Sequence, residues 1–310
     1  MPGLAEREKP RRKERVTIKE TINSYAFFPG CSLNSTGLEY GLSTLAVAGA
    51  LDLELIEIPD WNCCGASAAH ATDELLSLVL PARNLALAEK MGLEVVIPCA
   101  GCFGRWRAAE AALQDPAMKD RIQEVIGKTI YGTTKSYSLL DFMDKRIGAE
   151  TIRQKAVRPL TGLKVACYYG CLLLRPLELT QAEDTENPLG MDHLLEAAGA
   201  TVVDWPYKNQ CCGGNLASAR TDLVLAMAEK LLRMAKEAGA EALVTACPLC
   251  MFNLDARQEE IVSKFKQPFK LPLYYFTELI GLSFGLSPER LGLNRHFIDP
   301  RPQLKELALL

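Results

Sequence analysis

Ten of the eleven cysteines in this 310-residue chain fall into two sets of the same form. Each set has one cysteine, then a vicinal pair followed by glycine, then a Cys-x-x-Cys motif, and 34 residues separate the pair from that motif in both sets. The members are Cys31, Cys63, Cys64, Cys99 and Cys102 in the first set, and Cys171, Cys211, Cys212, Cys247 and Cys250 in the second. The pattern C…CC-G…C-x-x-C is therefore written twice, and each copy offers five soft sulfur ligands.

Thiol chemistry without a metal explains this pattern poorly. Free cysteine is common in protein cores, yet core cysteines have no reason to follow a duplicated spacing. A Cys-x-x-Cys pair can also exchange disulfides, but a single pair is enough for that chemistry. Each set gathers five sulfurs, which points to metal binding.

Zinc and iron–sulfur clusters are the two metal alternatives. Four thiolates that include a Cys-x-x-Cys half-site are an ordinary structural zinc set, although the fifth cysteine is then unexplained. Adjacent residues such as Cys63 and Cys64 cannot easily reach one ion, whereas a cluster offers them separate metals. The chain has no C-x2-C-x2-C-x3-C-P run, so an ordinary ferredoxin site is excluded. The residues favour an unusual iron–sulfur cluster in each set, with zinc still open.

The hydrophobic pattern predicts the elements that must position these cysteines. Short apolar runs predict strands at residues 25–28, 54–58, 94–97, 164–169, 201–204 and 242–245. Helices are expected between them at 38–51, 73–91, 192–198 and 221–238. This alternation predicts an α/β fold of two pseudo-symmetric repeats, each a small parallel sheet flanked by helices. Every cysteine group follows a predicted strand, so the cluster sites are expected at the carboxyl edges of the strands.

The repetition extends beyond the cysteines and indicates two domains. Residues 88–99 resemble residues 235–247, and each repeat closes with a similar amphipathic segment, at 137–143 and 274–280. We expect a polar, basic N-terminal tail (1–24), two cysteine-rich domains (25–157 and 158–285) and a C-terminal tail (286–310).

Composition and charge exclude several classes of protein. A chain of 310 residues can bury a large core, so it does not need the disulfides of a small secreted scaffold. Residues 1–24 contain no apolar signal block, and no run of 18 apolar residues could span a membrane. The net charge of −3 gives no case for nucleic acid. We expect a cytoplasmic protein with reduced thiols.

The doubled pattern resembles the cysteine-rich CCG domains found in the B subunit of heterodisulfide reductase, over residues 25–285. The segments that carry the resemblance most closely are Phe28-Pro-Gly-Cys31-Ser, Ala166-Cys-Tyr-Tyr-Gly-Cys171-Leu-Leu-Leu-Arg-Pro176 and Glu186-Asn-Pro188. The resemblance implies two non-cubane [4Fe-4S] clusters, each held by the five cysteines of one set, with one member of the vicinal pair bridging irons.

The resemblance also implies a reaction and its partners. The family reduces a disulfide to two thiols between its two clusters, so a small-molecule or protein disulfide is the expected substrate. We expect the substrate cleft between the repeats, on their pseudo-two-fold axis. The implied electron donors are the ferredoxin-like C subunit and the flavin-containing A subunit of such a complex. The alternatives are an electron-transfer iron–sulfur subunit of a lactate-, glycolate- or glycerol-phosphate-type oxidoreductase and a zinc-stabilised scaffold without catalysis.

Three features lie outside the two cysteine sets. Cys167 precedes Cys171 by four residues and is expected to be a buried spare thiol. His70 is a candidate proton donor, although a packed or exposed histidine is the ordinary interpretation. Residues 181–190 lengthen the second repeat relative to the first and form either a surface loop or a substrate contact.

Overall fold

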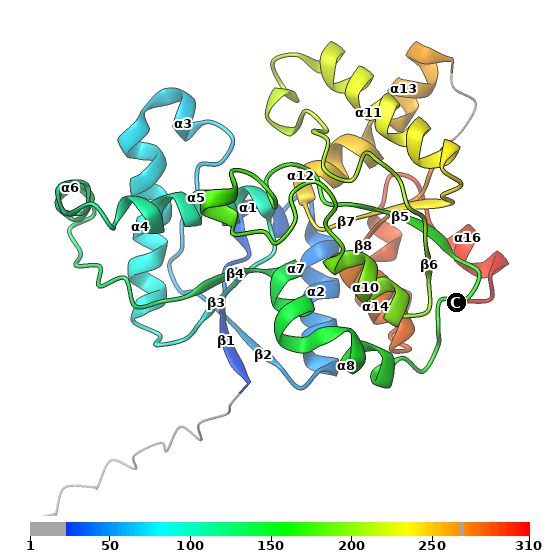
Figure 1. Ribbon diagram of the computed structural model, residues 1–310, viewed down its shortest axis with the longest axis horizontal. Helices are drawn as coiled ribbons and strands as arrows, with labels where there is room; N and C mark the ends of the chain where they lie inside the picture. The colour runs from blue at the N-terminus through cyan, green and yellow to red at the C-terminus, as the bar shows by residue number, and fades with distance from the viewer. Residues whose placement is uncertain (1–22, 267–269) are drawn as a thin grey trace, which may run out of the picture.

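The computed structural model describes residues 23–266 and 270–310. The predicted basic tail therefore lies outside the described residues, apart from Asn23 and Ser24. Two four-stranded sheets, both entirely parallel, form the framework of the molecule. Figure 1 shows the first repeat on the left and centre and the second on the right. The α/β prediction with two repeats is confirmed.

The first sheet has the strand order β2-β1-β3-β4. Its strands are β1 (Ser24–Phe27), β2 (Glu54–Glu57), β3 (Val95–Ile97) and β4 (Ser136–Ser138). The accompanying helices are α1 (Gly30–Leu33), α2 (Leu38–Ala50), α3 (Ala69–Thr72), α4 (Glu74–Glu89), α5 (Ala100–Ala112), α6 (Pro116–Ile126), α7 (Leu139–Phe142), the π-helix η1 (Met143–Ile147) and α8 (Gly148–Lys155). All of β3 is buried, as expected for a parallel strand covered on both faces.

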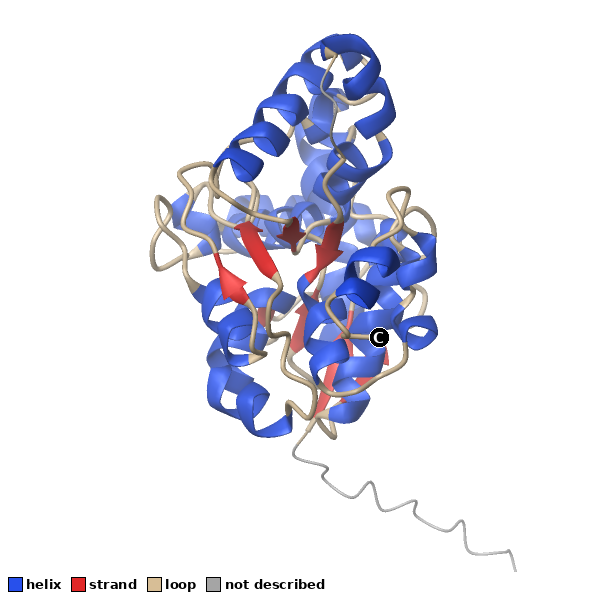
Figure 2. Ribbon diagram, turned by 90° about the vertical axis from the view of Figure 1, so that its right-hand side faces the viewer, coloured by secondary structure: helices blue, strands red, loops and turns tan. Residues whose placement is uncertain are grey.

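The second sheet repeats this topology as β6-β5-β7-β8. Its strands are β5 (Lys164–Tyr168), β6 (Thr201–Val202), β7 (Ala242–Thr245) and β8 (Leu273–Tyr275). Its helices are α9 (Leu177–Thr180), α10 (Gly190–Ala197), the 3-10 helix η2 (Gly214–Leu216), α11 (Thr221–Glu237), α12 (Pro248–Met251), the π-helix η3 (Phe252–Ala256), α13 (Gln258–Phe265) and α14 (Phe276–Ser283). Figure 2 shows the strands in the interior of the molecule with helices around them.

The fourth strand of each sheet differs from the sequence prediction. The closing segments at 137–143 and 274–280 were expected to be amphipathic, but each belongs to a short strand followed by a helix, β4 with α7 and β8 with α14. A strand of three residues is too short to display a period of two. Its edge position in the sheet follows from pairing with β3 or β7.

The two repeats share a hydrophobic core. One cluster of buried residues lies entirely within the first repeat, whereas a larger one joins the second repeat to residues of α2, β3 and α7. Helix α2 packs against α14, where Ser43 Oγ and Thr277 Oγ1 lie 2.7 Å apart. Residues 286–310 follow the second repeat as α15 (Pro288–Leu291), η4 (Leu293–Arg295) and α16 (Arg301–Glu306), and they bury Leu291, Leu293 and Leu304.

None of the helices in residues 23–266 and 270–310 combines the length and the hydropathy that a membrane span requires.

Candidate functional site

The first cysteine of each set follows a strand through a glycine that no other residue can replace without strain. Gly30 and Gly170 have φ of +65° and +68°, a region that other residues adopt at a cost. A Cβ at Gly30 would lie 2.9 Å from Cys102 Sγ, and one at Gly170 would lie 3.1 Å from Cys250 Sγ. In both repeats this glycine therefore lets the loop after the first strand approach the second sulfur of Cys-x-x-Cys.

The other cysteines occupy turns with the same design in both repeats. The glycines after the vicinal pairs, Gly65 and Gly213, also have positive φ, +74° and +80°. Cys99 is the N-cap residue of α5, and Cys247 is the N-cap residue of α12. A position at the amino end of a helix favours the thiolate form of cysteine, which is the form that binds metals.

The sulfurs of the first set are close together. Cys31 Sγ lies 3.6 Å from Cys63 Sγ, and Cys64 Sγ lies 3.1 Å from Cys102 Sγ. Cys31 and Cys63 are exposed, while the other three members are buried. The first set therefore has an open side formed by one cysteine of the strand loop and one of the vicinal pair.

The five sulfur residues of the second set line one cavity of about 100 Å³. The other walls are mainly apolar and include Tyr169, Leu172, Leu216 and Leu249. Cys212 Sγ and Cys250 Sγ lie 3.5 Å apart, and the backbone N–H of Gly213 donates to Cys211 Sγ over 3.2 Å. All five predicted residues of this set are thus brought to a single small space.

Each set favours ionisation of some thiols at the expense of others. The interactions of Cys64 with Cys102 and Cys63 lower the pKa of Cys64 to about 4, and the interaction with Cys64 raises the pKa of Cys63. In the second set a hydrogen bond from Cys171 lowers the pKa of Cys211 to about 6. Five thiolates in one place repel one another. A bound cationic metal would compensate that repulsion.

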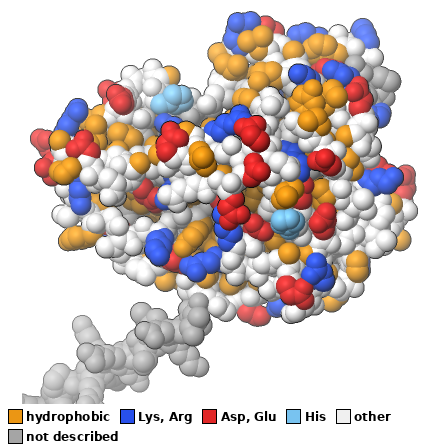
Figure 3. Space-filling view, viewed as in Figure 1, with side chains coloured by type: hydrophobic (Ala, Val, Ile, Leu, Met, Phe, Trp, Pro, Cys, Tyr) orange, Lys and Arg blue, Asp and Glu red, His pale blue; other side chains and the backbone are white. Residues whose placement is uncertain are grey.

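The two sets face each other across the boundary between the repeats. The pKa of Cys247 is held well below its ordinary value by hydrogen bonds from Cys250 and from Cys99 of the other set. A Cβ at Gly101 would lie 3.4 Å from Leu249 Cδ1, so the two Cys-x-x-Cys turns are in contact. Figure 3 shows a hollow between the lobe with α3 and α4 and the lobe with α11 and α13, and in Figure 1 α1 and α12 lie between these lobes.

The donor set fits an iron–sulfur cluster. Within residues 23–266 and 270–310, no three His, Cys, Asp or Glu side chains are arranged as ligands of one metal ion. Three observations therefore support the fit: the ligands are all thiols, the second set shares one cavity, and a glycine backbone lies close to Cys102 Sγ and to Cys250 Sγ. Soft thiolates that converge in a mainly apolar space are the surroundings that iron–sulfur clusters use.

The remaining sequence candidates lie in different surroundings. His70 is exposed on α3, and its role as a proton donor stays a prediction. Cys167 lies on β5 with no exposed surface. Burial, followed by the nearby Asp192 carboxylate, raises the pKa of its thiol well above the ordinary value. The burial agrees with the expectation, and the role of Cys167 as a spare thiol stays a prediction.

The loop at residues 181–190 is tied to the second repeat. Arg175 pairs with Glu186 over 2.7 Å, and Asn209 Nδ2 donates to the carbonyl of Thr185 over 3.0 Å. The loop borders a second cavity of about 240 Å³. Tyr169 lines both this cavity and the cysteine-lined one, so it links the surroundings of the loop to those of the second cysteine set.

Sequence reasoning missed a buried ionic network behind that tyrosine. Lys208 Nζ donates to Asp192 Oδ1 over 2.6 Å, and Tyr169 OH donates to Asp192 Oδ2 over 2.6 Å. The side chains of Lys208 and Asp192 are only 4% and 7% exposed. A lysine three residues before a vicinal cysteine pair was visible in the sequence, but its partner on α10 was not.

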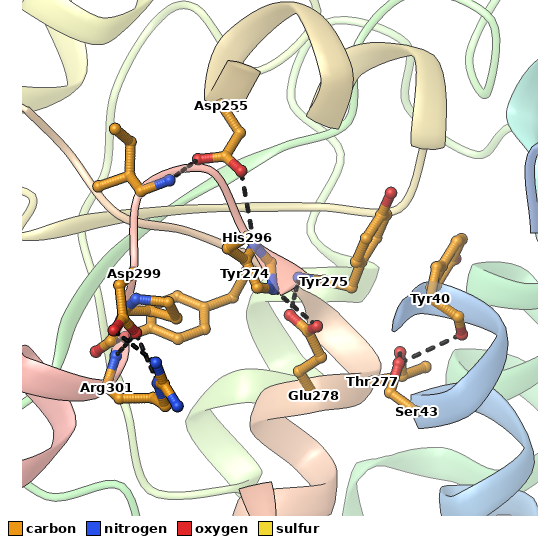
Figure 4. Close-up of polar contacts among 12 residues, drawn as sticks. Tyr40, Ser43, Asp255, Tyr274, Tyr275, Thr277, Glu278, His296, Asp299 and Arg301 are labelled. Carbon is orange, nitrogen blue, oxygen red and sulfur yellow. Dashed lines mark hydrogen bonds and ion pairs between the residues drawn. The ribbon is translucent and has the colours of Figure 1, made fainter. Parts of the chain in front are cut away.

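A second buried group, here named the seam cluster, was also missed. It consists of Glu39, Asp255, Glu278 and His296, and it lies where α2 of the first repeat meets η3, α14 and the segment after η4. Figure 4 shows Asp255, Glu278 and His296. His296 Nε2 lies 2.8 Å from Glu278 Oε1. Burial alone would lower the pKa of His296, but Glu278 and Asp255 raise it to about 9. Burial raises the pKa of Glu39 to about 7.

The seam cluster is connected to the cysteines by two tyrosines. The rings of Tyr40 and Tyr275 are stacked with centroids 4.1 Å apart, and Figure 4 shows Tyr275 between Tyr40 and His296. Tyr40 OH donates to the carbonyl of Ala246, the residue before Cys247, over 3.3 Å. The seam therefore positions the turn at which the two cysteine sets meet.

Two parallel sheets, each with five cysteines at its carboxyl edge, define a duplicated cysteine-rich protein. The cysteine-rich domain family CCG matches residues 25–106 and 165–255. This chain belongs to that family, together with the B subunits of heterodisulfide reductases.

Two curated relatives match nearly the whole chain. The 8-methylmenaquinol:fumarate reductase membrane anchor subunit of Wolinella succinogenes is 37% identical over 278 residues, which cover 89% of this chain and 97% of the relative. The B subunit of the ferredoxin:CoB-CoM heterodisulfide reductase of Methanosarcina mazei is 32% identical over 285 residues, 90% and 95% of the two chains.

A solved structure shows the same fold. The crystal structure of a hypothetical protein from Helicobacter pylori superposes with a TM-score of 0.71 at 13% identity, and the match covers 89% of this chain and 52% of that chain. At this identity the likeness concerns the fold alone.

Proposed function

We propose that this chain is the catalytic iron–sulfur subunit of a heterodisulfide reductase-like complex, which reduces a disulfide to two thiols. The observation that carries the proposal is the juxtaposition of the two cysteine sets. Their Cys-x-x-Cys turns meet at Gly101 and Leu249, and Cys99 of one set is near enough to shift the pKa of Cys247 of the other. Two redox sites that face one another can act on the two halves of one substrate. The relationship to the B subunit of heterodisulfide reductase supports the same conclusion.

The ligands in this proposal are the ten cysteines of the two sets, Cys31, Cys63, Cys64, Cys99 and Cys102, then Cys171, Cys211, Cys212, Cys247 and Cys250. Each set would hold one non-cubane [4Fe-4S] cluster, and when bound the clusters would supply electrons one at a time. Cleavage of R–S–S–R′ takes up two electrons and two protons and yields R–SH and R′–SH. The chain's own residues keep the two sites adjacent and surround the second one with apolar side chains.

The electrons must reach the chain from a donor. We propose a ferredoxin-like C subunit and a flavin-containing A subunit, as in heterodisulfide reductase complexes. The exposed sulfurs Cys31, Cys63 and Cys211 mark sides at which such a donor or the disulfide could approach.

A second candidate function rests on the Wolinella relative, which belongs to an 8-methylmenaquinol:fumarate reductase. In that role the same ten cysteines would pass electrons between a quinol and a fumarate reductase without cleaving a disulfide. The lactate- or glycolate-type alternative is less favoured, because the two relatives compared above are of other kinds.

One experiment tests the metal and the reaction together. The chain is purified anaerobically with its complex, and iron, zinc and acid-labile sulfide are quantified alongside EPR spectra with and without candidate disulfides and thiols. We expect about four irons per cysteine set and a spectrum that changes when the matching thiol or disulfide is added.

Two outcomes would contradict the proposal in different ways. Zinc without iron would remove the redox function altogether. Intact clusters whose spectra stay unchanged with every disulfide but respond to a quinol would favour the fumarate reductase role.

A further inference from the structure

A buried amide, Asn253, lies directly beside the vicinal cysteine pair of the second set. Its Nδ2 is 3.2 Å from the carbonyl oxygen of Cys212 and 3.8 Å from Cys212 Sγ. Only 1% of Asn253 is exposed, so water does not compete for these contacts. The NH2 group of the amide is therefore within hydrogen-bonding distance of both the backbone and the sulfur of Cys212.

The orientation of this amide leaves its oxygen without a partner among the described residues. A buried polar atom without a hydrogen bond costs stability, and such atoms in native proteins often have a functional reason. Both acceptors of the Asn253 amide belong to Cys212. The NH2 end is therefore directed at this cysteine, and the amide oxygen is left without a hydrogen bond among the described residues. Stability alone does not explain the arrangement.

The backbone around Asn253 departs from the first repeat. Helix α12 ends at Met251 and continues as the π-helix η3, Phe252–Ala256, which contains Asn253. The corresponding residue after the first Cys-x-x-Cys motif is Arg105, which lies in the uninterrupted helix α5. π-Helical turns re-aim side chains and are frequent at functional sites. The side chain and the backbone that carries it thus distinguish the second set from the first.

We propose that Asn253 is a tuning residue that raises the reduction potential of the second cysteine site above that of the first. The proposal rests on the proposed function, in which the second set holds a redox-active cluster. An N–H donor to a ligand sulfur stabilises the more negative, reduced state, because hydrogen bonds to the sulfurs help to set cluster potentials. One electron from the external donor then occupies the second site in preference to the first.

The test is a redox titration followed by EPR on the anaerobic complex, with wild type, Asn253→Leu and Asn253→Asp. Leucine has a similar size and removes the N–H donors, and aspartate removes them and adds negative charge. We expect the midpoint potential of the second cluster to fall in the order Asn, Leu, Asp, while the first cluster stays unchanged. At fixed potential the ratio of reduced to oxidised second sites should fall about tenfold in Asn253→Leu, which corresponds to about 59 mV for one electron. Cys212→Ser identifies which signal belongs to the second set, and Arg105→Leu is the matched control in the first repeat.

The outcomes separate this inference from the proposed function. Wild type without iron–sulfur clusters would contradict the proposed function. Wild type with two clusters, combined with full iron content and unshifted potentials in both Asn253 variants, would overturn the tuning role alone. If Asn253→Leu loses iron, the isosteric Asn253→Asp provides the test. A merely structural role of Asn253 predicts that Asn253→Asp, when it retains its cluster, has the wild-type potential.

Discussion

The two cysteine sets share one spacing and one loop geometry, but their surroundings differ. In the first repeat Phe28 lies between Trp61 and Trp106, with ring centroids 5.5 and 4.9 Å away. In the second repeat the aligned residue is Tyr168, whose hydroxyl donates to the carbonyl of Gln210 over 2.7 Å. Tyr168 still has an aromatic neighbour, Trp205, with ring centroids 6.2 Å apart. Duplication has therefore kept the ligands and added a polar contact at this aromatic position.

The same contrast holds at the next position along each loop. Pro29 of the first repeat corresponds to Tyr169 of the second, which binds the buried pair of Asp192 and Lys208. Cluster potentials depend on hydrogen bonds, charge and solvent exposure around the sulfurs. Two sites with the same ligands can thus differ in reduction potential. Such a difference would set the order in which the two sites take up and deliver their electrons.

The largest effect is expected from the loss of one buried ligand of a vicinal pair. In Cys64→Ser and Cys212→Ser we expect iron to fall from about eight to about four atoms per chain, because each set binds its own cluster. Disulfide reduction should be lost in both variants, since two electrons are required from two sites. Iron analysis and EPR distinguish the two, and a loss of all iron in either variant would show that the sets do not assemble independently.

The next largest effect concerns the seam cluster between the repeats. The folded-state pKa of His296 is about 9, above its ordinary 6.5, so its contribution to stability is fully present below pH 6.5 and is lost as the pH rises through 9. Glu39, raised from 4.5 to about 7, likewise contributes below pH 4.5 and loses that contribution as the pH rises through 7. The free energy of unfolding should therefore fall between pH 6.5 and 9, by on the order of 3 kcal/mol from His296.

Urea unfolding of the anaerobic protein at pH 6 and pH 9 measures this fall. His296→Gln should reduce the difference between the two pH values, whereas the exposed His193, replaced in the same way, serves as the control. Equal pH dependence in wild type and His296→Gln would mean that Glu39, Asp255 and Glu278 do not hold the imidazolium as the geometry indicates.

A smaller effect is expected at the glycines that approach the sulfurs. Gly30→Ala and Gly170→Ala share a backbone cost of about 1–2 kcal/mol for left-handed φ, but the added Cβ is closer to sulfur at Gly30, 2.9 Å against 3.1 Å at Gly170. Gly127→Ala has the same backbone cost, with φ of +62° and no atom within 4 Å of the added Cβ. We expect the largest loss of iron in Gly30→Ala, a smaller loss in Gly170→Ala and none in Gly127→Ala. The melting temperature should fall by a similar amount in all three variants, because the backbone cost is the same. Iron loss in Gly127→Ala would show that strain alone disturbs the sites.

The cysteine pattern made much of this arrangement predictable. Residues such as Gly65 and Cys99 follow strands in sequence, and parallel strands present their carboxyl ends at one edge, so the gathering of each set follows from local patterns and general topology. The facing of the two sets was expected from the resemblance, and the contact of Gly101 with Leu249 agrees with it.

The rest depends on packing between distant segments. Glu39, Asp255, Glu278 and His296 show no common spacing, and each alone is an ordinary surface-type residue. Their burial arises because α2 of the first repeat packs on α14 of the second. The turn of Asn253 toward Cys212 likewise depends on a π-helix, for which the sequence has no simple signal.

The smallest effect is expected at Cys167, the sulfur outside both sets. Aligning the two strand ends places Cys167 where the first repeat has Phe27, and both residues are buried core positions. The Asp192 carboxylate is near enough to raise the pKa of its thiol, so the hydroxyl of Cys167→Ser, which has a similar size, keeps a polar neighbour. We expect unchanged iron content and a change in unfolding free energy within about 1 kcal/mol, whereas Cys171→Ser should lose the second cluster. Cys167 lies on β5 and Cys171 in the loop that follows it. A loss of iron in Cys167→Ser would mean that the second repeat uses a sixth sulfur that the first cannot supply.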